Sequence, residues 1–324
     1  MNNKSFNRIP AYILLACLVI FGAMYFGSVV KNCSGDTTRN ESKWGGVNAD
    51  DSYVTGGTAD GAKSVSKGNE FTAERPAERD EEAPSEGLSQ IMYEALEQPA
   101  PLNTKPEVIL CKSAFLISYN ITTLCPNYVA WHLTEERTKG NVKRTDKFIE
   151  DMALGEGIRV TPNDYYNSGY DRGHMCPAAD NKNNERAMEE SFIMTNICPQ
   201  SHSLNAGMWE ELERSCREWA SQGGDLYIVC GPIFDSKPPK KLGNRKNMKV
   251  SVPDRFFKVI LLMGKEPRAI GFIMPNQAIG GRLSSYAVSV DKVEEITGID
   301  FYPNLPDAVE RKVERQCSPS AWGL

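Results

Sequence analysis

One long stretch of the chain offers almost nothing for a folded core. Residues 34–105 contain eight glycines, many Ser, Thr and Asp residues, and an acidic run at 78–82. Segments of low hydrophobicity and high charge bury too little apolar surface to offset the conformational entropy lost on folding. We therefore expect an acidic disordered linker over 34–105, which confines folding to one domain at 106–318. A segment of that length can bury a sizeable core.

The N-terminal segment, residues 1–33, has the pattern of a membrane anchor. Residues 9–30 are uncharged and mostly apolar, with Lys4 and Arg8 before them and Lys31 after them. About 20 such residues cross a bilayer as a helix, whereas a cleaved signal peptide has an apolar region of only about 7–15 residues. The length favours an N-terminal transmembrane helix over a removed signal. The flanking charges favour a cytoplasmic N-terminus. The domain is then expected to be exported, periplasmic or at the cell surface, and secreted if the segment is cleaved.

The net charge of −5 does not exclude a nucleic-acid partner. The chain has 42 acidic and 37 basic residues, whereas proteins that neutralise phosphates tend to carry a basic surface. Most of the acidic excess, however, lies in the linker, which holds 14 acids and 7 bases. The domain after it is close to neutral. Binding to a polyanion would therefore depend on local basic side chains and on a cation.

Apolar and alternating runs predict an α+β domain. β-Rich segments are expected at 108–118, 128–133, 225–234, 255–263 and 269–275. A helix is expected over 204–221, where Met208, Leu212 and Cys216 share one stripe, and another over 290–297 with Ser289 as its N-cap. Many strands and few helices favour a mostly antiparallel sheet.

The cysteines are compatible with export. Seven of the nine lie in the domain, so at least one of them is unpaired there or pairs outside it. No CxxC pair occurs and the three histidines lack zinc-site spacing, so no structural zinc is expected. Cys176 and Cys198, each followed by proline, are the favoured disulfide pair.

The residues that carry chemistry begin with Asp-Arg-Gly-His at 171–174. His174 can take a proton from water near neutral pH, and the guanidinium of Arg172 can bind phosphate. Downstream, Asn205 offers a neutral oxygen to a hard cation, with a helix N-cap as the alternative interpretation. Glu213 follows after eight residues, about 12 Å along a helix, and therefore suits metal-bound water better than direct ligation.

Three motifs together resemble the signature of the DNA/RNA non-specific endonucleases, the sugar-nonspecific nucleases that include endonuclease G. They are DRGHMCPAAD at 171–180, MTNICPQ at 194–200 and LNAGMWEELE at 204–213. The similarity extends over roughly 108–306. It implies a ββα-metal (His-Me finger) nuclease fold, in which a histidine-bearing strand faces a metal-binding helix beside a central antiparallel sheet.

The resemblance also implies roles, a cofactor and substrates. His174 matches the general base that activates water, Asn205 the direct protein ligand of Mg²⁺, and Glu213 the acid associated with the water shell of the metal. Arg172 matches the motif arginine. Mn²⁺ or another divalent cation can take the place of Mg²⁺, and the implied substrates are DNA and RNA.

An upstream arginine in the family stabilises phosphate charge, and Arg144 is its best match, with Arg137 second. His132 is expected to be packed in a strand and His202 to be exposed. Two further features have two readings each. Tyrosines 165, 166 and 170 either stack on bases or serve as core and rim residues, and the basic stretch 237–249 either contacts phosphate or is a solvated turn.

Two other functions remain open. One is a catalytically degenerate module that binds nucleic acid without cutting it, although the intact motif residues argue against this. The other is a phosphodiesterase acting on a different substrate. DNA or RNA preference, homodimerisation and an inhibitor partner are not given by the sequence.

Overall fold

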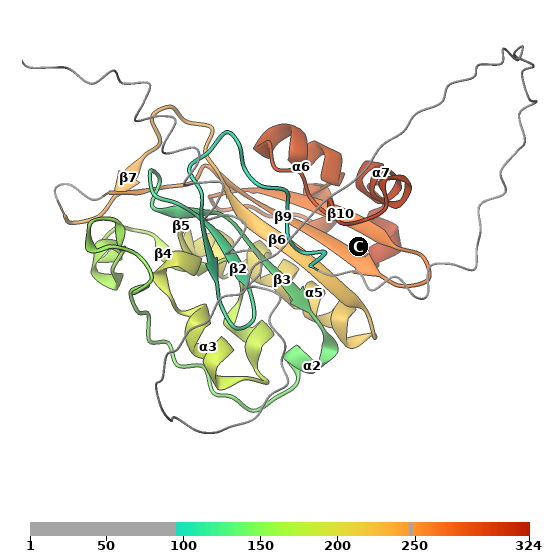
Figure 1. Ribbon diagram of the computed structural model, residues 1–324, viewed down its shortest axis with the longest axis horizontal. Coiled ribbons are helices and arrows are strands. Elements are labelled where there is room, and N and C mark those ends of the chain that lie inside the picture. Colours follow the sequence, from blue (N-terminus) through green and yellow to red (C-terminus); the bar gives the residue numbers. More distant parts are fainter. Residues whose placement is uncertain (1–94, 246–248) are drawn as a thin grey trace, which may run out of the picture. The chain divides into compact units, whose positions relative to one another are not determined.

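A seven-stranded antiparallel sheet organises the protein, and the computed structural model describes residues 95–245 and 249–324 (Figure 1). The strand order is β1-β2-β3-β6-β9-β10-β11, and every neighbouring pair is antiparallel. The strands are β1 (Val108–Cys111), β2 (Leu116–Asn120), β3 (Cys125–Leu133), β6 (Asp225–Ile233), β9 (Arg255–Met263), β10 (Arg268–Pro275) and β11 (Ala287–Val288).

The sheet is covered on both faces, which explains why its central strands are apolar throughout. Consecutive residues of β6 and β9 are buried, on either side of the sheet. Helices α6 (Val290–Thr297) and α7 (Asp307–Arg315) lie against β9 and β10 on one face (Figure 1). Helix α5 (Met208–Ser221) packs on the other face through Met208, Leu212 and Cys216, which confirms the predicted stripe.

Two small sheets, three short α-helices and six 3₁₀ turns complete the described part of the fold. Strand β4 (Asp171–His174) pairs antiparallel with β5 (Ile197–Gln200), and β7 (Lys241–Leu242) pairs with β8 (Val250–Ser251). The short helices are α2 (Glu135–Thr138), α3 (Glu185–Ser191) and α4 (His202–Asn205). The order β4, β5, α4, α5 places the three motifs side by side, because β4 carries the first, β5 the second and α4–α5 the third.

The predicted elements differ from the structure in two places. The segment 108–118 contains two strands, since the chain turns between Cys111 and Leu116. The helix predicted over 204–221 begins at Met208, because the chain turns at Gly207 after the short helix α4. A Cβ atom at Gly207 would lie 2.4 Å from the carbonyl oxygen of Ser203, so the turn requires glycine.

The predicted disulfide between Cys176 and Cys198 is wrong, because both thiols are free and buried. Cys198 lies opposite Gly173 in the β4–β5 ladder, whereas Cys176 follows the end of β4 and its sulfur accepts a hydrogen bond from Asn181. The two side chains therefore belong to different environments. Cys111, by contrast, is disulfide-bonded.

Other predictions concern the ends of the chain. Buried side chains lie beyond the predicted limits of 106 and 318, among them Leu96 and Trp322. Within 95–245 and 249–324, no helix is long and apolar enough to cross a membrane. The predicted transmembrane segment at 9–30 and nearly all of the predicted linker lie outside the described residues, so both stay predictions.

Candidate active site

His174 ends strand β4 and lies in an aromatic pocket. Its ring centroid is 4.9 Å from that of Phe192 and 5.4 Å from that of Phe148. The imidazole is buried, and its Nε2 atom has no hydrogen-bond partner within the described structure. Burial, reinforced by the nearby charge of Arg144, lowers the pKa of His174 to about 3. The histidine is therefore neutral at pH 7, the state that a proton acceptor needs.

Two exposed arginines contact the same rings. The guanidinium of Arg172 lies 4.7 Å from the centroid of Phe148, and that of Arg144 lies 5.1 Å from the centroid of Phe192. Since both rings contact His174, the structure brings His174, Arg172 and Arg144 close together. Arg144 also pairs with Asp146. The arrangement sets two forked cations beside a neutral base.

Arg137, the second candidate for the upstream arginine, has a different environment. Its guanidinium donates to the carbonyl oxygen of His132 and to the side-chain oxygen of Asn181. These bonds tie the end of β3 to the loop after the DRGH motif. Arg137 therefore has a supporting role in the fold, and Arg144 is the arginine that lies beside His174.

Asn205 closes the short helix α4, where its side chain is oriented by Asp171. Its Nδ2 atom donates to Oδ2 of Asp171 over 3.0 Å, and Nδ1 of His202 lies 2.9 Å from the same oxygen. The N-cap of α5 is Gly207, so the N-cap interpretation of Asn205 is wrong. Because the amide nitrogen is engaged with Asp171, the amide oxygen is the atom that Asn205 can offer to a cation.

Gln200 packs across β4 beside these residues. It is fully buried, and neither its amide oxygen nor its amide nitrogen has a partner in the described structure. A Cβ atom at Gly173 would lie 2.2 Å from Oε1 of Gln200, so only glycine leaves room for this side chain. The amide oxygen of Asn205 is the kind of ligand that a hydrated divalent cation prefers, since such an ion binds oxygen atoms and keeps several waters.

Glu213 lies half-buried on α5, near the buried side chains of Lys258 and Asp180. Burial raises its pKa to about 7, Lys258 and Arg217 act against that shift, and Asp180 adds to it. Lys258 is fully buried, 4.7 Å from the centroid of Trp209. None of these neighbours is a residue that the sequence assigned to the site, so the water-shell role of Glu213 stays a prediction.

Several residues of the site were missed or left without a role. Asn196 is buried and fixes the backbone of Cys176, two residues after His174. Its side chain accepts from the amide of Cys176 and donates to the carbonyl oxygen of Cys176. Phe148 and Phe192 gave no signal, since isolated aromatic residues are ordinary core residues. Only the packing of their rings against His174 shows that they belong to the site.

The remaining candidates separate into core, rim and support. His132 stacks on Tyr227 with centroids 4.4 Å apart, as expected for a packed strand residue. Tyr165 is a core residue, whereas Tyr166 is 67% exposed. From the basic stretch, Lys240 lies over the ring of Tyr170, at 4.9 Å from its centroid.

A family model for DNA/RNA non-specific endonuclease matches residues 94–308. The chain belongs to the DNA/RNA non-specific endonuclease family. A protein from Nostoc sp. named as a nuclease is 36% identical over 227 residues, which cover 65% of this chain and 80% of the relative. Mitochondrial nuclease EXOG is 38% identical in Danio rerio over 59% of each chain, and 33% identical in Homo sapiens over 60% of this chain and 57% of the relative. The chain thus spans less than two thirds of these two EXOG proteins.

The same family relation is visible in the fold. A crystal structure of the EndoG/EndoGI complex matches with a TM-score of 0.58 and 27% sequence identity, over 64% of this chain and 89% of that chain. This chain therefore has the mixed fold with a central antiparallel sheet that is found in EndoG. The expected family is confirmed.

Proposed function

We propose that this protein is a metal-dependent endonuclease that hydrolyses phosphodiester bonds of DNA and RNA with little sequence specificity. The observation that carries the proposal is the environment of His174, a buried neutral imidazole whose Nε2 atom has no partner, with two exposed arginines beside it. The β4–β5 pair followed by α4 and α5 supports a ββα-metal site.

In the proposed mechanism, Nε2 of His174 takes a proton from water, and the resulting hydroxide attacks phosphorus in line with the leaving oxygen. The bond from phosphorus to that oxygen breaks, and the leaving oxygen takes up a proton from solvent water. The aromatic walls of Phe148 and Phe192 hold the ring in place and keep it neutral. Arg172 and Arg144 bind the non-bridging oxygens and stabilise the charge that develops on them. Preorganised cations of this kind cost no reorganisation during the reaction.

The cation would be held by the amide oxygen of Asn205, oriented through Asp171. When bound, a divalent cation, Mg²⁺ in our proposal, supplies charge neutralisation at the phosphate and the leaving oxygen. Glu213 is proposed to order water around it. The raised pKa of Glu213, about 7, implies that this carboxyl is fully ionised only in mildly alkaline solution.

The lack of sequence preference follows from the kind of contacts available. Arg144 and Arg172 are suited to phosphate, which is the same at every nucleotide. Exposed Tyr166 offers a ring on which any base can stack. With a domain near neutrality, we expect modest binding that weakens as salt is added.

The test is digestion of supercoiled plasmid and of single-stranded RNA, each with Mg²⁺ and with EDTA. The proposal requires that both substrates are cut in Mg²⁺ and that EDTA stops the cutting. Retardation of DNA on a gel without cleavage would instead support the degenerate binding module. Inactivity on both substrates, together with hydrolysis of a small phosphodiester, would instead support a phosphodiesterase that acts on a different substrate.

A further inference from the structure

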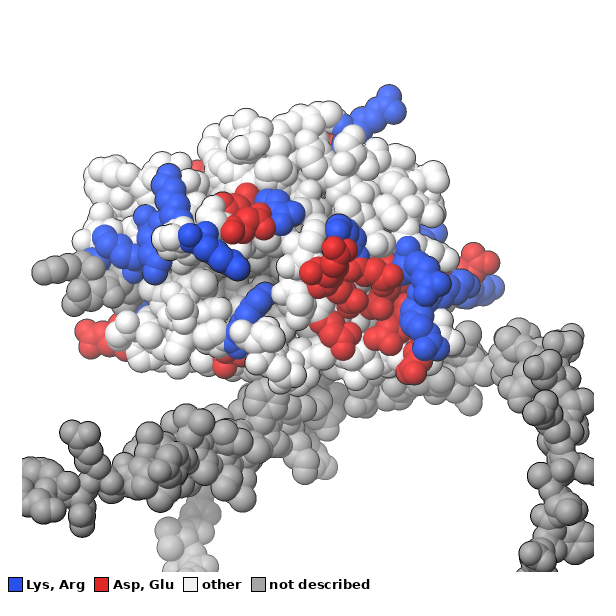
Figure 2. All heavy atoms as spheres, turned by 90° about the horizontal axis from the view of Figure 1, so that it is seen from above, with Lys and Arg blue, Asp and Glu red and all other residues white. Residues whose placement is uncertain are grey.

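Three carboxylates meet between the two helices that cover the sheet face opposite to α5. Asp291 and Glu294 come from α6 and Glu314 comes from α7, and one oxygen of each lies within 4.8 Å of the others. Figure 2 shows acidic side chains gathered on the side of the molecule where α6 and α7 lie. The helices pack on each other and on β10, so their backbones hold the three carboxylates close together.

Glu314 distinguishes this group from an ordinary acidic surface. Its side chain is only 6% exposed, and its buried Oε1 atom has no hydrogen-bond partner in the described part of the chain. A buried carboxylate oxygen without a partner lowers the stability of the fold, because it has lost its hydrogen bonds to water and gained none in return. Glu294 is fixed in turn, because its Oε1 atom accepts from the backbone amide of Phe301 over 2.8 Å.

The charges around the group do not neutralise it. Burial and the acids Glu294, Glu310, Asp291 and Asp300 raise the pKa of Glu314 to about 9. Burial also raises the pKa of Glu294 to about 7, although the backbone hydrogen bond from Phe301 lowers it.

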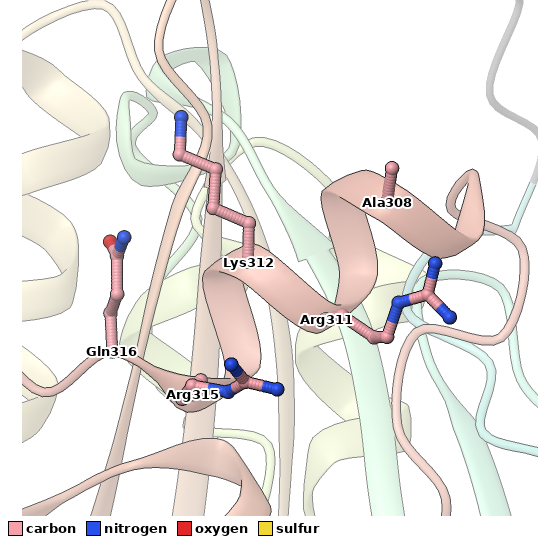
Figure 3. A pocket seen from close by; sticks show the side chains of 5 residues that line it. All are labelled: Ala308, Arg311, Lys312, Arg315 and Gln316. Atoms are coloured by element: carbon pink, nitrogen blue, oxygen red, sulfur yellow. The ribbon is translucent and has the colours of Figure 1, made fainter. Parts of the chain in front are cut away.

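The basic side chains of α7 do not compensate for this excess of acid. Arg311, Lys312 and Arg315 line a separate pocket along the helix, together with Ala308 and Gln316 (Figure 3). None of the ion pairs within 4.0 Å in the described residues involves Asp291, Glu294 or Glu314.

We infer that Asp291, Glu294 and Glu314 form a binding site for a divalent cation, with Ca²⁺ as the best fit. Ca²⁺ lies 2.3–2.6 Å from its oxygen ligands, so two ligands of one ion can be up to about 5 Å apart. Mg²⁺ requires about 2.1 Å and thus at most about 4 Å between ligands. The three oxygens lie within 4.8 Å of one another, inside the span that one Ca²⁺ ion can bridge. Ca²⁺ also accepts irregular carboxylate geometry, whereas Mg²⁺ demands a near-ideal octahedron. Water and the second carboxylate oxygens complete its six to eight ligands.

The position of Glu314 in the last turn of α7 also favours a cation, because the free carbonyl groups there carry partial negative charge. A bound ion would join α6 to α7 and so stabilise the C-terminal layer on the sheet. Val290, Val293 and Val313, the neighbours of the three acids, belong to the core on this face of the sheet, whereas Phe148 and Phe192 beside His174 pack in other clusters. The role of the cation site is therefore structural and separate from the proposed chemistry.

The experiment is calorimetric titration of CaCl₂ into protein carrying Asn205→Ala, which removes the proposed ligand in the active site. We expect one Ca²⁺ per chain, with submillimolar affinity like that of extracellular calcium modules. Adding Glu314→Gln should weaken binding by at least about tenfold, since even loss of a ligand's supporting contact costs 10–100-fold. The matched control is Glu295→Gln on α6, an exposed acid paired with Lys292, which should leave binding unchanged.

Thermal unfolding supplies a second readout. Ca²⁺ should raise the melting temperature of the Asn205→Ala protein by several degrees and leave that of the Glu314→Gln form unchanged. Asp291→Asn, a change at an exposed position that should not impair folding, must show the same loss. The inference is overturned if Ca²⁺ at about 5 mM neither binds nor stabilises, if the Glu314→Gln and Asp291→Asn proteins bind as well as their parent, or if Mg²⁺ binds there more tightly than Ca²⁺.

Discussion

Replacing Glu213 by glutamine should change how the stability of the protein depends on pH. Burial raises the pKa of Glu213 from 4.5 to about 7 in the folded protein. Between these values the folded state keeps a proton that the unfolded state has released. The free energy of unfolding therefore falls as pH rises through this window. Glutamine cannot titrate, so the variant lacks this contribution.

The size of the effect follows from the two pKa values. One pKa unit corresponds to about 1.4 kcal/mol, and most of the 2.5-unit window lies between pH 5 and pH 8. Relative to the unmodified protein, the Glu213→Gln variant should gain about 2.5 kcal/mol on going from pH 5 to pH 8. Other titrating groups, such as Glu294 and Glu314, contribute equally to both proteins and cancel in the difference.

The assay is urea unfolding at pH 5 and pH 8, followed by tryptophan fluorescence. Glu218→Gln is the matched control, because Glu218 lies on the same helix and is exposed. It should show no difference between the two pH values beyond a few tenths of a kcal/mol. If Glu213→Gln changes the free energy of unfolding by the same amount at pH 5 and pH 8, the pKa of Glu213 is not raised by folding and the prediction is wrong.

Three further predictions concern the residues around the DRGH motif. In the metal-free protein, NMR should show the His174 imidazole neutral down to pH 5, and a titration midpoint near 6.5 would contradict its burial. Because the unfolded chain binds a proton at this imidazole below about pH 6.5 and the folded chain does not, His174 should lower the free energy of unfolding as pH falls through that value. Asn205→Ala should shift the Mg²⁺ dependence of cleavage to higher concentration, and an unchanged titration would remove Asn205 from the site. Gly173→Ala should cost about 1–3 kcal/mol in urea unfolding through its clash with Gln200, and a loss below 0.5 kcal/mol would show that Gln200 moves freely.

Sequence patterns predicted the elements that are specified locally. The strand at 255–263 matches β9 residue for residue, because a run of large apolar residues bounded by turn signals has few other solutions. Helix α6 begins after Ser289 as predicted, and the hydroxyl of Ser289 accepts from the amide of Lys292. Helix α7 was not predicted, since Val309 and Val313 are its only large apolar residues among many charges. Packing against the sheet, rather than local pattern, stabilises it.

The candidate site likewise contains residues that sequence motifs pointed to and residues that they missed. His174, Arg172 and Asn205 lie within contiguous motifs, so the sequence was enough to select them. The aromatic walls at Phe148 and Phe192 were missed, because they come from separate segments that only the tertiary fold brings to the histidine.

Side-chain direction was likewise invisible in the sequence. The expected pairing of Cys176 with Cys198 was wrong because it rested on sequence position, whereas the β4–β5 register decides which residues face each other.

The most direct test of His174 as the general base is plasmid cleavage by the His174→Ala variant in Mg²⁺, with His132→Ala as the matched control. His132 stacks on Tyr227 and pairs with Asp225, neither of which is a residue of the His174 pocket. We predict that His174→Ala folds and melts cooperatively but loses cleavage by at least about 100-fold, the typical share of a general base, whereas His132→Ala keeps it. Full activity of the His174→Ala protein would contradict the central claim that this imidazole activates the attacking water.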